Sequence, residues 1–330
     1  MVPPLPRTFP FICPSHNQPL HFVILPTKMV RYMRTDTTFK SGFVSIIGAP
    51  NVGKSTLLNR ILGQKIAITS AKPQTTRNRI MGICHLPQAQ LIFLDTPGIH
   101  RGKGVLNKRM VEVAMQVLAD ADLAILMIDG AGQGGNPDKM ILQALKKEGV
   151  PVILAMNKVD LIKKKMVLPL IDRWRSTYPF EAIIPISALQ GIQVDELVSE
   201  MIKLLPEGPR YYPEENLTDV SQRFIAAEVV REKVFRLTGD EIPYSVAVVV
   251  ESFKERVDKD LVEIYATIYV ERQSQKPIII GKKGKMLKQI GEYARKDIEQ
   301  MVGRKVFLRL WVQVRKNWTK DEKIIKGFGY

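Results

Sequence analysis

Residues 43–60 read Phe-Val-Ser-Ile-Ile-Gly-Ala-Pro-Asn-Val-Gly-Lys-Ser-Thr-Leu-Leu-Asn-Arg, and this stretch decides the fold. An apolar run precedes Gly48, four residues separate Gly48 from Gly53, and a lysine, a serine and a helix-forming stretch follow. Glycines let backbone N–H groups turn toward a phosphate without interference from a Cβ atom. A strand, a loop with this spacing and a helix together predict a phosphate-binding P-loop.

The chemistry of the loop follows from its last residues. The helix after Gly53 directs its positive N-terminal end at the phosphates. Lys54 would reach the β- and γ-phosphates of a nucleotide, and the Ser55 hydroxyl would hold Mg²⁺. The predicted phosphate-binding residues are Gly48, Ala49, Pro50, Asn51, Val52, Gly53, Lys54, Ser55 and Thr56.

The composition limits the class of protein. A chain of 330 residues favours two domains. The net charge of +16 indicates a polyanionic partner, either nucleic acid or an anionic membrane surface, although a generally basic solvated surface would give the same value. Two cysteines, Cys13 and Cys84, form no disulfide framework or metal cluster and fit a reducing cytosol. No apolar run approaches the roughly 18 residues that span a bilayer.

Residues 1–40 differ from the rest, because they are rich in proline and their basic residues face one acid, Asp36. An organelle transit peptide is similarly poor in acids, but the prolines oppose the amphipathic helix that such a peptide needs. The composition favours the alternative, in which translation starts at Met29 or Met33 and this extension is disordered or carries a misassigned start.

From residue 41 to residue 206, short apolar runs alternate with segments of helical period. This alternation predicts an α/β domain with a doubly wound, mostly parallel sheet that binds ligands at the carboxyl ends of its strands. Strands are expected over residues 43–47, 80–85, 90–94, 123–128, 150–156 and 182–186. Helices are expected over residues 105–119, 138–147, 167–177 and 194–205.

One of these strand ends carries the run Asp95-Thr96-Pro97-Gly98. The Asp95 carboxylate can reach Mg²⁺ there through water, and the Gly98 N–H can meet a γ-phosphate. By itself, Asp-x-x-Gly could be any turn. Its position downstream of a P-loop indicates the second switch of a nucleotide-hydrolysing domain.

A later strand end carries Asn157-Lys158-Val159-Asp160. The Asp160 carboxylate can accept hydrogen bonds from N1–H and the exocyclic amine of guanine, whereas adenine offers neither donor. The aliphatic stem of Lys158 can lie across the base, and Asn157 would tie this loop to the P-loop. The backbone N–H groups of Ser187 and Ala188, after the next strand, would meet guanine O6. These residues favour GTP over ATP.

These motifs, in this order, resemble the translation-factor-like GTPases with a TrmE/Era-type domain. The resemblance implies that residues 72–77, Lys-Pro-Gln-Thr-Thr-Arg, are the first switch. Within it, Thr76 contacts Mg²⁺ and the γ-phosphate, although Thr75 next to it could take that role. The implied Mg²⁺ ligands are therefore Ser55, Thr76 and Asp95.

The residue after Asp-Thr-Pro-Gly is Ile99, where signalling GTPases carry a water-orienting glutamine. The Ile99 side chain cannot hydrogen-bond, so backbone groups, another ion or a partner must orient the water, and intrinsic hydrolysis should be slow. In the TrmE relatives, an asparagine at the position of Asn51 helps to hold K⁺. The alternative is that Asn51 only shapes the loop, and His100 is expected to be only a switch-loop residue.

The composition changes near residue 206, where Pro-Glu-Gly-Pro-Arg-Tyr-Tyr-Pro indicates a linker. We place the linker at residues 207–219 and a second domain at residues 220–330. A helix over residues 220–236 should be capped by Asp219 or Thr218, and Thr319 should cap a closing helix. Strands are expected over residues 244–251, 261–271 and 306–315, and a further helix over residues 286–301.

Gly281-Lys-Lys-Gly284 follows an isoleucine run in this domain. It resembles the loop of a KH domain, where two short helices meet at a Gly-x-x-Gly turn that clamps single-stranded nucleotides. The order of elements fits the α+β type II KH arrangement, and residues 272–291 contain no acid. The alternative is a solvated basic turn in an interaction domain. The expected RNA-binding residues are Gly281, Lys282, Lys283, Gly284, Lys285 and Lys288.

Residues 41–330 as a whole resemble the Era family of GTPases, on the run from Leu205 to Pro213 and the helix segment from Arg231 to Arg236. The resemblance implies a cytoplasmic, monomeric, Mg²⁺-dependent enzyme that converts GTP to GDP and phosphate. It further implies binding to the 3′ region of small-subunit (16S-type) rRNA and a role in 30S maturation, and it allows peripheral contact with the inner face of the cell membrane. Residues 1–40 have no counterpart in the family pattern, and Ala49 stands where many members have arginine.

Two other classes of function stay open at this point. One is an RNA-binding protein whose nucleotide switch does not hydrolyse GTP, which a steady-state GTPase assay would separate. The other is a membrane-surface GTPase whose basic domain binds anionic lipid. Aromatic or amphipathic anchors would support the second class, and the sequence has none beyond ordinary helix faces.

Overall fold

The fold is described from a computed structural model of the chain. The structure describes residues 38–330 except residues 71, 73–74, 100–104, 133–138 and 240–241. The expectations for the N-terminal extension, apart from its last three residues, and the expectation for His100 therefore concern residues outside the described ranges. Along the described helices, none combines the length and apolarity that crossing a bilayer requires.

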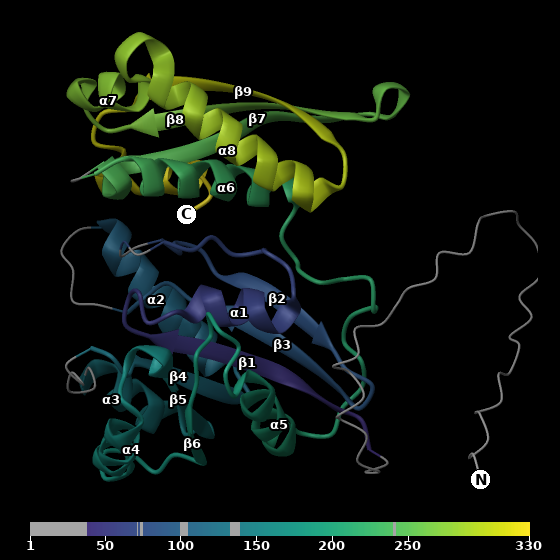
Figure 1. The fold of residues 1–330 in the computed structure, drawn as a ribbon, viewed down its shortest axis with the longest axis vertical. Coiled ribbons are helices and arrows are strands. Elements are labelled where there is room, and N and C mark those ends of the chain that lie inside the picture. Colours follow the sequence, from purple (N-terminus) through teal and green to yellow (C-terminus); the bar gives the residue numbers. More distant parts are fainter. Residues whose placement is uncertain (1–37, 71, 73–74, 100–104, 133–138, 240–241) are drawn as a thin grey trace, which may run out of the picture. The chain divides into compact units, whose positions relative to one another are not determined.

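The first sheet has six strands in the order β2-β3-β1-β4-β5-β6 (Figure 1). All neighbouring strands are parallel except β2, which runs antiparallel to β3. The strands are β1 (Lys40–Gly48), β2 (Ile80–His85), β3 (Ala89–Asp95), β4 (Leu123–Asp129), β5 (Val152–Asn157) and β6 (Ala182–Pro185). Every residue of β3 and β5 is buried, as expected for parallel strands covered on both faces. The predicted α/β fold is confirmed.

Helices cover both faces of this sheet. They are α1 (Lys54–Leu62), α2 (Val105–Ala119), α3 (Lys139–Glu148), α4 (Val167–Arg175) and α5 (Val194–Leu204). One apolar cluster joins the sheet to α1 and α5, and another joins it to α2, α3 and α4. The loops at the carboxyl ends of β1, β3, β5 and β6 therefore meet at one edge, where a doubly wound sheet binds its ligand.

The second sheet has three strands in the order β7-β8-β9, with β7 antiparallel and β9 parallel to β8. Its elements are α6 (Gln222–Leu237), β7 (Val246–Arg256), β8 (Leu261–Val270), α7 (Lys276–Ile280), α8 (Lys285–Val302), β9 (Lys305–Val314) and α9 (Glu322–Gly327). The even-numbered residues of β8 belong to the apolar cluster that α6 and α8 close over one sheet face (Figure 1). The opposite face carries the odd-numbered residues of β8 and β9.

Both predicted caps in this part of the chain are wrong. Ser221 caps α6, because its Oγ accepts a hydrogen bond from the Phe224 N–H at 3.2 Å. Thr218 and Asp219 lie too far before the first turn to do so. Asp321 caps α9 in place of Thr319, whose hydroxyl instead donates to a neighbouring carboxylate.

The predicted linker is attached to the first sheet. Gln90 in β3 is fully buried, and its Oε1 accepts hydrogen bonds from the N–H groups of Tyr211 and Tyr212 at 2.7 and 3.1 Å. Its Nε2 donates to the Tyr212 carbonyl at 2.7 Å. Further on, the Ile83 N–H donates to the Leu217 carbonyl at 2.8 Å. We refer to the contacts of Gln90 as the Gln90 clasp.

Candidate functional site

The loop between β1 and α1 has backbone conformations that require glycine. Gly53 has a φ of 104°, and a Cβ atom there would lie 2.2 Å from Asn157 Nδ2. A Cβ on Gly48 would lie 2.4 Å from the Met127 carbonyl oxygen. The loop can therefore approach β4 and β5 closely, and it begins α1 with the N-terminal N–H groups exposed to an anion.

Lys54 lies inside this loop. Its buried Nζ donates to the carbonyls of Gly48 and Ala49 at 3.2 and 2.9 Å. Burial lowers the pKa of Lys54 to about 8, although the nearby Asp95 carboxylate opposes the shift. The ammonium group is thus held at the centre of the loop, where phosphate oxygens could replace the carbonyls as its acceptors.

The three predicted Mg²⁺ ligands meet beside the loop. Ser55 Oγ donates to Asp95 Oδ2 at 2.7 Å and lies 2.9 Å from Thr76 Oγ1. Asp95 Oδ1 is buried and has no hydrogen-bond partner among the described residues. Burial raises the pKa of Asp95 to about 6, against the opposing effects of Lys54 and Ser55. Oxygen ligands with one desolvated carboxylate fit Mg²⁺, which takes its other ligands from water and phosphates.

A cavity of about 60 Å³ opens between the P-loop and the first switch. Its lining includes Pro50, Asn51, Ser55, Thr75, Thr76 and Gly98. Gly98 packs against the loop so closely that a Cβ atom would lie 2.7 Å from Pro50 Cα. The second switch can therefore bring a backbone N–H to a phosphate in this cavity.

Ile99 turns away from the cavity. Its side chain is 2% exposed and belongs to the apolar cluster beneath the sheet, while its N–H donates to the Gly48 carbonyl at 3.1 Å. The side chain thus cannot reach a water molecule at the phosphates, whereas the sequence indicated only that it could not form a hydrogen bond.

Asn157 joins the predicted guanine-binding loop to the P-loop, and the expected tie between the two loops is present. Its Nδ2 donates to the Val52 carbonyl at 2.7 Å, and its Oδ1 accepts from the Ala188 N–H at 2.9 Å. Lys158 has a positive φ of 66°, and Asp160 is exposed in the short helical turn Val159–Leu161. The Asn157 side chain therefore connects its own loop to the P-loop and to the loop after β6.

Asp129, at the end of β4, was not predicted from the sequence. Its Oδ2 accepts a hydrogen bond from Lys158 Nζ at 2.5 Å. Burial alone would raise the pKa of Asp129, but the Lys158 bond and two backbone N–H groups hold it below the usual range. The pair orients the lysine stem. The sequence did contain a signal for Asp129, because an acidic residue directly after a predicted strand lies at the edge of the sheet where ligands bind.

The loop after β6 differs from expectation. The Ser187 N–H donates to the Ile192 carbonyl at 3.1 Å, and the Ala188 N–H donates to Asn157. We expected both groups to face guanine O6. The Ser187 N–H is instead bonded within the turn that ends at Ile192, and the Ala188 N–H is bonded to the Asn157 side chain.

The first switch is held by α6. Arg231 is fully buried, and its guanidinium donates to the Thr75 carbonyl and to both carboxylate oxygens of Glu228. Lys72 Nζ donates to the Phe235 carbonyl at 2.6 Å. The segment that carries Thr76 is therefore fixed by side chains and carbonyls that lie more than 150 positions later in the sequence.

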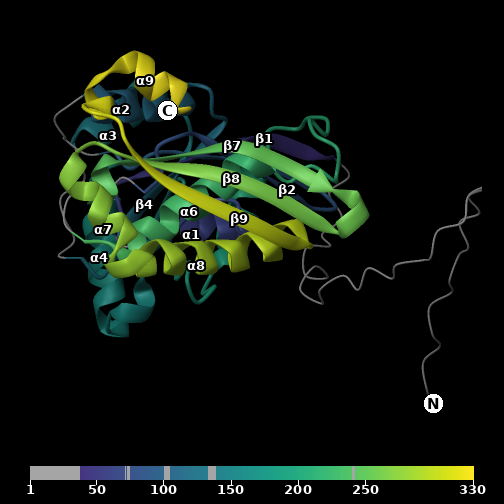
Figure 2. The ribbon, with the colours of Figure 1, turned by 90° about the horizontal axis from the view of Figure 1, so that it is seen from above.

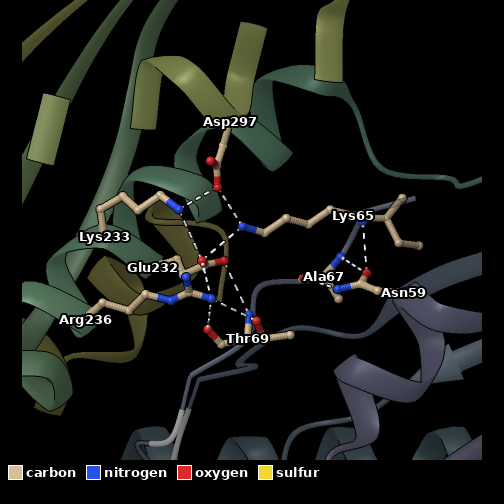
Figure 3. Close-up of polar contacts among 9 residues, drawn as sticks. Asn59, Lys65, Ala67, Thr69, Glu232, Lys233, Arg236 and Asp297 are labelled. Atoms are coloured by element: carbon tan, nitrogen blue, oxygen red, sulfur yellow. Dashed lines mark hydrogen bonds and ion pairs between the residues drawn. The ribbon is translucent and has the colours of Figure 1, made fainter. Parts of the chain in front are cut away.

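Charged residues extend this contact (Figure 3). Lys65 Nζ lies 2.9 Å from Glu232 Oε1 and 2.7 Å from Asp297 Oδ2, and Lys233 Nζ lies 2.5 Å from the same Asp297 oxygen. The Thr69 N–H donates to Glu232 at 3.4 Å. Burial would raise the pKa of Asp297, but hydrogen bonds from the two lysines hold it below the usual range.

Arg77, next to Thr76, is also buried. It donates to the carbonyls of Val246 and Pro243 at 2.7 and 3.1 Å. Its guanidinium lies 5.5 Å from the ring centroid of Trp318 and 5.2 Å from that of Tyr330. Burial, with a contribution from the nearby Arg231, lowers the pKa of Arg77 to about 10. No sequence pattern indicated these contacts, because a basic residue in a polar loop is ordinarily solvated.

The Gly-x-x-Gly segment joins two helices, α7 and α8. The isoleucine run is α7. Gly281 has a φ of 71°, and a Cβ atom there would lie 2.6 Å from the Met286 Cβ. Lys283 also has a positive φ, of 53°. The loop lysines, together with the two that follow in α8, are exposed: Lys282, Lys283, Lys285 and Lys288.

A groove of about 460 Å³ runs from this loop along α8 and the edge strand β9. Gly284, Leu287, Lys288, Arg295 and Leu308 are among the residues that line it. Because β9 has no neighbour beyond β8 in its sheet among the described strands, its outer edge offers backbone N–H and C=O groups to a ligand. The groove has the features that single-stranded nucleotides require.

Comparison with known proteins identifies both parts of the chain. Residues 43–158 match the 50S ribosome-binding GTPase family, and residues 241–319 match the KH domain family. GTPase Era of Geobacter metallireducens is 57% identical over 296 residues, which cover 90% of this chain and 99% of that protein. This chain belongs to the Era family. GTPase Era of Halothermothrix orenii is 49% identical and covers 89% of the chain and 99% of its own length.

Two solved Era structures cover 88% of this chain and 99% of their own. One is Era in complex with MgGDPNP and nucleotides 1506–1542 of 16S ribosomal RNA, with a TM-score of 0.86 at 46% identity. The other is a single-residue variant of Aquifex aeolicus Era bound to GDP·AlF₄⁻, with a TM-score of 0.86 at 47% identity. The predictions of an Era-type GTPase with a C-terminal KH domain, and of GTP, GDP and Mg²⁺ as ligands, are confirmed.

Proposed function

We propose that this Era-family chain couples GTP hydrolysis to the maturation of the small ribosomal subunit by binding the 3′ region of 16S-type rRNA. The observation that carries the proposal is that one chain contains two sites. One is a P-loop with candidate Mg²⁺ ligands beside it, and the other is an exposed Gly-Lys-Lys-Gly loop at the end of a groove. The solved Era complex with nucleotides 1506–1542 of 16S rRNA supports the choice of RNA.

We also propose the division of the chain. Residues 41–206 form the GTPase domain, residues 207–219 the linker and residues 220–330 the type II KH domain. The two separate sheets support this division, as does the attachment of residues 211–217 to β2 and β3.

The nucleotide site acts through positioning and charge. The P-loop N–H groups and Lys54 bind the β- and γ-phosphates, and the Gly98 N–H adds a further donor. Ser55, Thr76 and Asp95 would hold Mg²⁺, which neutralises charge on the transferring phosphoryl group when bound. Since the buried Ile99 side chain cannot orient the attacking water, intrinsic turnover is expected to be slow, and K⁺ held beside Asn51 would add positive charge at the phosphates. Stimulation of hydrolysis by K⁺ over Na⁺ that is lost in Asn51→Ala supports this role; absence of cation dependence in the unmodified chain removes it.

Base selection rests on the loops fixed by Asn157. Asp160 accepts the N1–H and amine hydrogens of guanine, and the Lys158 stem, oriented by Asp129, covers the base. Ser187 and Ala188 shape the wall of the site around Asn157.

We propose a monomer in the cytoplasm, because the groups of the nucleotide and RNA sites come from one chain. The net charge of +16 permits peripheral attraction to anionic lipid at the inner face of the cell membrane, which is a weaker and less specific contact than the RNA groove.

The test is binding of the full chain to a 16S rRNA 3′ fragment by fluorescence anisotropy. Lys282→Asp combined with Lys283→Asp should abolish binding while GTP affinity stays unchanged, because negative charge then faces the phosphates. Lys164→Asp combined with Lys165→Asp is the matched control. Both lysines are exposed, and the substitutions change the net charge by the same amount at a site far in sequence from the Gly-Lys-Lys-Gly loop. Unchanged RNA affinity in the first variant would remove the Gly-Lys-Lys-Gly loop as the RNA site of this proposal.

Milder changes sharpen the test. Lys282→Ala should lower the magnitude of the salt slope by about 0.7 for a lost phosphate contact, and sequence preference should survive. Crosslinking of the chain to total cellular RNA, with and without GTP, should then enrich the 3′ end of small-subunit rRNA.

A further inference from the structure

The solvent-facing row of β9 has an unusual composition. Alternate residues of the strand are exposed, namely Lys305, Phe307, Arg309, Trp311 and Gln313. The row contains two aromatic residues, two cations and no acid. In a strand, alternate side chains stand about 6.6 Å apart on one face. Single exposed rings are common, but neighbouring rings that stay exposed on one sheet face indicate a surface that contacts a ligand.

The rings are held in place by one another. Tyr265 of β8 lies 6.0 Å from Phe307 and 5.8 Å from Trp311 between ring centroids, and it stacks on the latter. The Arg309 guanidinium lies 5.1 Å from the Trp311 ring centroid. Phe307 nevertheless remains 46% exposed and Trp311 39% exposed. We call Tyr265, Phe307, Arg309 and Trp311 the aromatic platform.

A groove of about 480 Å³ continues from this row toward α9. It lies over the outer sheet face, because Tyr269 and Gln313 line it, and Phe328 of the C-terminal segment stacks on Tyr269 at 4.7 Å. Arg315 and Lys323 also line the groove, and both are exposed. Its described lining includes no acid. The platform therefore ends in a second cluster of positive charge.

The platform is separate from the Gly-x-x-Gly groove but adjoins it. The helices α6 and α8 cover the other face of this sheet, and β9 leads away to α9 (Figure 2). Arg309 belongs to both places, because it lines the α8–β9 groove and lies against Trp311. A single-stranded RNA that passes from the groove over the edge of β9 would reach the platform.

We propose that the aromatic platform is a second RNA-binding site, which stacks unpaired bases on Phe307 and Trp311. Lys305, Arg315 and Lys323 bind the flanking phosphates. The proposal rests on the proposed function in taking RNA as the ligand. Apart from Arg309, its residues lie outside the lining of the Gly-x-x-Gly groove. Flat rings alternating with cations suit a chain of bases and phosphates, and stacking on protein rings tolerates any base.

Tryptophan fluorescence reports on the platform directly. Trp174 is 3% exposed and Trp318 is fully buried, so that Trp311 is the one tryptophan of the described chain that a ligand can reach. Oligoadenylate of about twelve nucleotides should quench the fluorescence of the full chain, because bases stack on the indole. Inorganic polyphosphate of similar charge should not. Absence of quenching by RNA would overturn the proposal.

Variants give the second measurement. Phe307→Ala with Trp311→Ala should weaken oligoadenylate binding by about ten-fold or more, whereas Trp311→Phe should keep the affinity and lose the quenching. Leu168→Ala, at a residue that is 70% exposed in α4, is the control and should bind as the unmodified chain does. If the double alanine variant fails to bind GTP, Lys305→Glu combined with Arg315→Glu replaces it, because both residues are exposed and neither lines the Gly-x-x-Gly groove. Loss of oligoadenylate affinity is then expected, and unchanged affinity would overturn the proposal.

The Lys282→Asp, Lys283→Asp variant separates this proposal from the function proposed above. Quenching should persist in that variant, because the platform is intact. Quenching that disappears together with rRNA binding would overturn the platform and leave the Gly-x-x-Gly site standing. Normal rRNA binding in that variant, with quenching retained, would remove only the Gly-x-x-Gly assignment. Quenching by brominated phosphatidylglycerol vesicles in place of RNA would also overturn the platform, in favour of a lipid surface.

Discussion

At the scale of single residues, the glycines at the two ends of α1 differ in why another residue would be unfavourable there. At one end the cost is backbone strain alone, and at the other a side chain would also overlap a neighbouring residue. Gly53 and Gly63 both have positive φ, of 104° and 67°. A Cβ atom on Gly53 would overlap Asn157 Nδ2, whereas a Cβ atom on Gly63 would meet nothing within 4 Å. The two positions therefore share a conformational cost and differ in the space available.

This difference predicts unequal effects of alanine. Gly63→Ala should cost about 1–2 kcal/mol of stability and leave GTP affinity unchanged. Gly53→Ala should weaken GTP binding by at least about 100-fold, because the Asn157 bond to the Val52 carbonyl must open. Thermal unfolding and titration with a fluorescent GTP analogue measure the two quantities. Equal GTP affinity in both variants would contradict the role given to Asn157.

Asp160 allows a test of base choice. Asp160→Asn should weaken GTP binding by about 100-fold or more and gain affinity for xanthosine triphosphate, because the amide inverts the donor and acceptor pattern. Competition against a fluorescent nucleotide measures both affinities. Asp172→Asn, at an exposed residue of α4, is the control. Unchanged GTP affinity in Asp160→Asn would remove the guanine assignment.

Sequence reasoning could place residues whose position follows from the elements around them. Lys54 and Ser55 follow a glycine loop between a strand and a helix, and Asp95 ends a strand of the same parallel sheet, so the three meet at one edge. Asp129 was missed because its partner, Lys158, comes from the next strand. Arg231 was missed because nothing in its helix shows that a distant carbonyl will accept its hydrogen bond.

At the scale of elements, α6 is a helix whose charged face is buried. Glu228, Arg231, Glu232 and Lys233 are each at most 5% exposed, although charges in a helix normally indicate a solvated side. They are buried because Lys65 pairs with Glu232, the Thr75 carbonyl accepts from Arg231, and Asp297 pairs with Lys233. The bounds of α6 were predictable to within two residues, but the environment of its polar face was not.

The Arg231 contact predicts that a substitution there lowers the rate of GTP hydrolysis and leaves GDP binding nearly unchanged. Arg231→Lys should lower kcat for GTP by about ten-fold to 100-fold, because the Thr75–Thr76 peptide loses its anchor. GDP affinity should stay within roughly two-fold, because the switch residue Thr76 acts on the γ-phosphate and its metal. Single-turnover hydrolysis and GDP titration measure these effects.

The control for this prediction lies in the same helix. Arg223 donates to the Val250 carbonyl at 2.9 Å and makes no contact with the switch among the contacts of the described residues. Arg223→Lys should therefore leave kcat unchanged. A parallel loss of GDP affinity in Arg231→Lys would show that Arg231 maintains the fold and does not position the switch.

At the scale of the whole molecule, the order of elements was predictable and their mutual contacts were not. Alternation of strands and helices indicated the first sheet, and the order of elements after residue 220 indicated the second. Met110 of α2 belongs to one apolar cluster with Trp318 and with Ile325 of α9, and this cluster joins residues about 200 positions apart. Such contacts depend on how two surfaces match in space, which no periodicity in either segment records.

Trypsin can test how firmly the linker is attached. Gln90→Ala removes the acceptor for two N–H groups and the donor to one carbonyl, so cleavage after Arg210 should accelerate several-fold. Gln88→Ala, two residues earlier and partly exposed, is the control and should digest at the normal rate. Equal digestion of the two variants would show that the clasp adds nothing to the attachment of the linker.

The Gln90 clasp has a mechanical consequence. Attachment continues to Thr218, whose hydroxyl donates to the Met81 carbonyl at 2.6 Å. Only residues 219–221 then separate Thr218 from the start of α6 at Gln222, and the Asp219 carboxylate itself lies 3.5 Å from the Arg79 guanidinium. Three extended residues reach about 10 Å. Residues 219–221 are therefore a short tether between β2 and α6. The clasp and the Thr218 bond must both open before the full length of the linker can separate α6 from the first sheet.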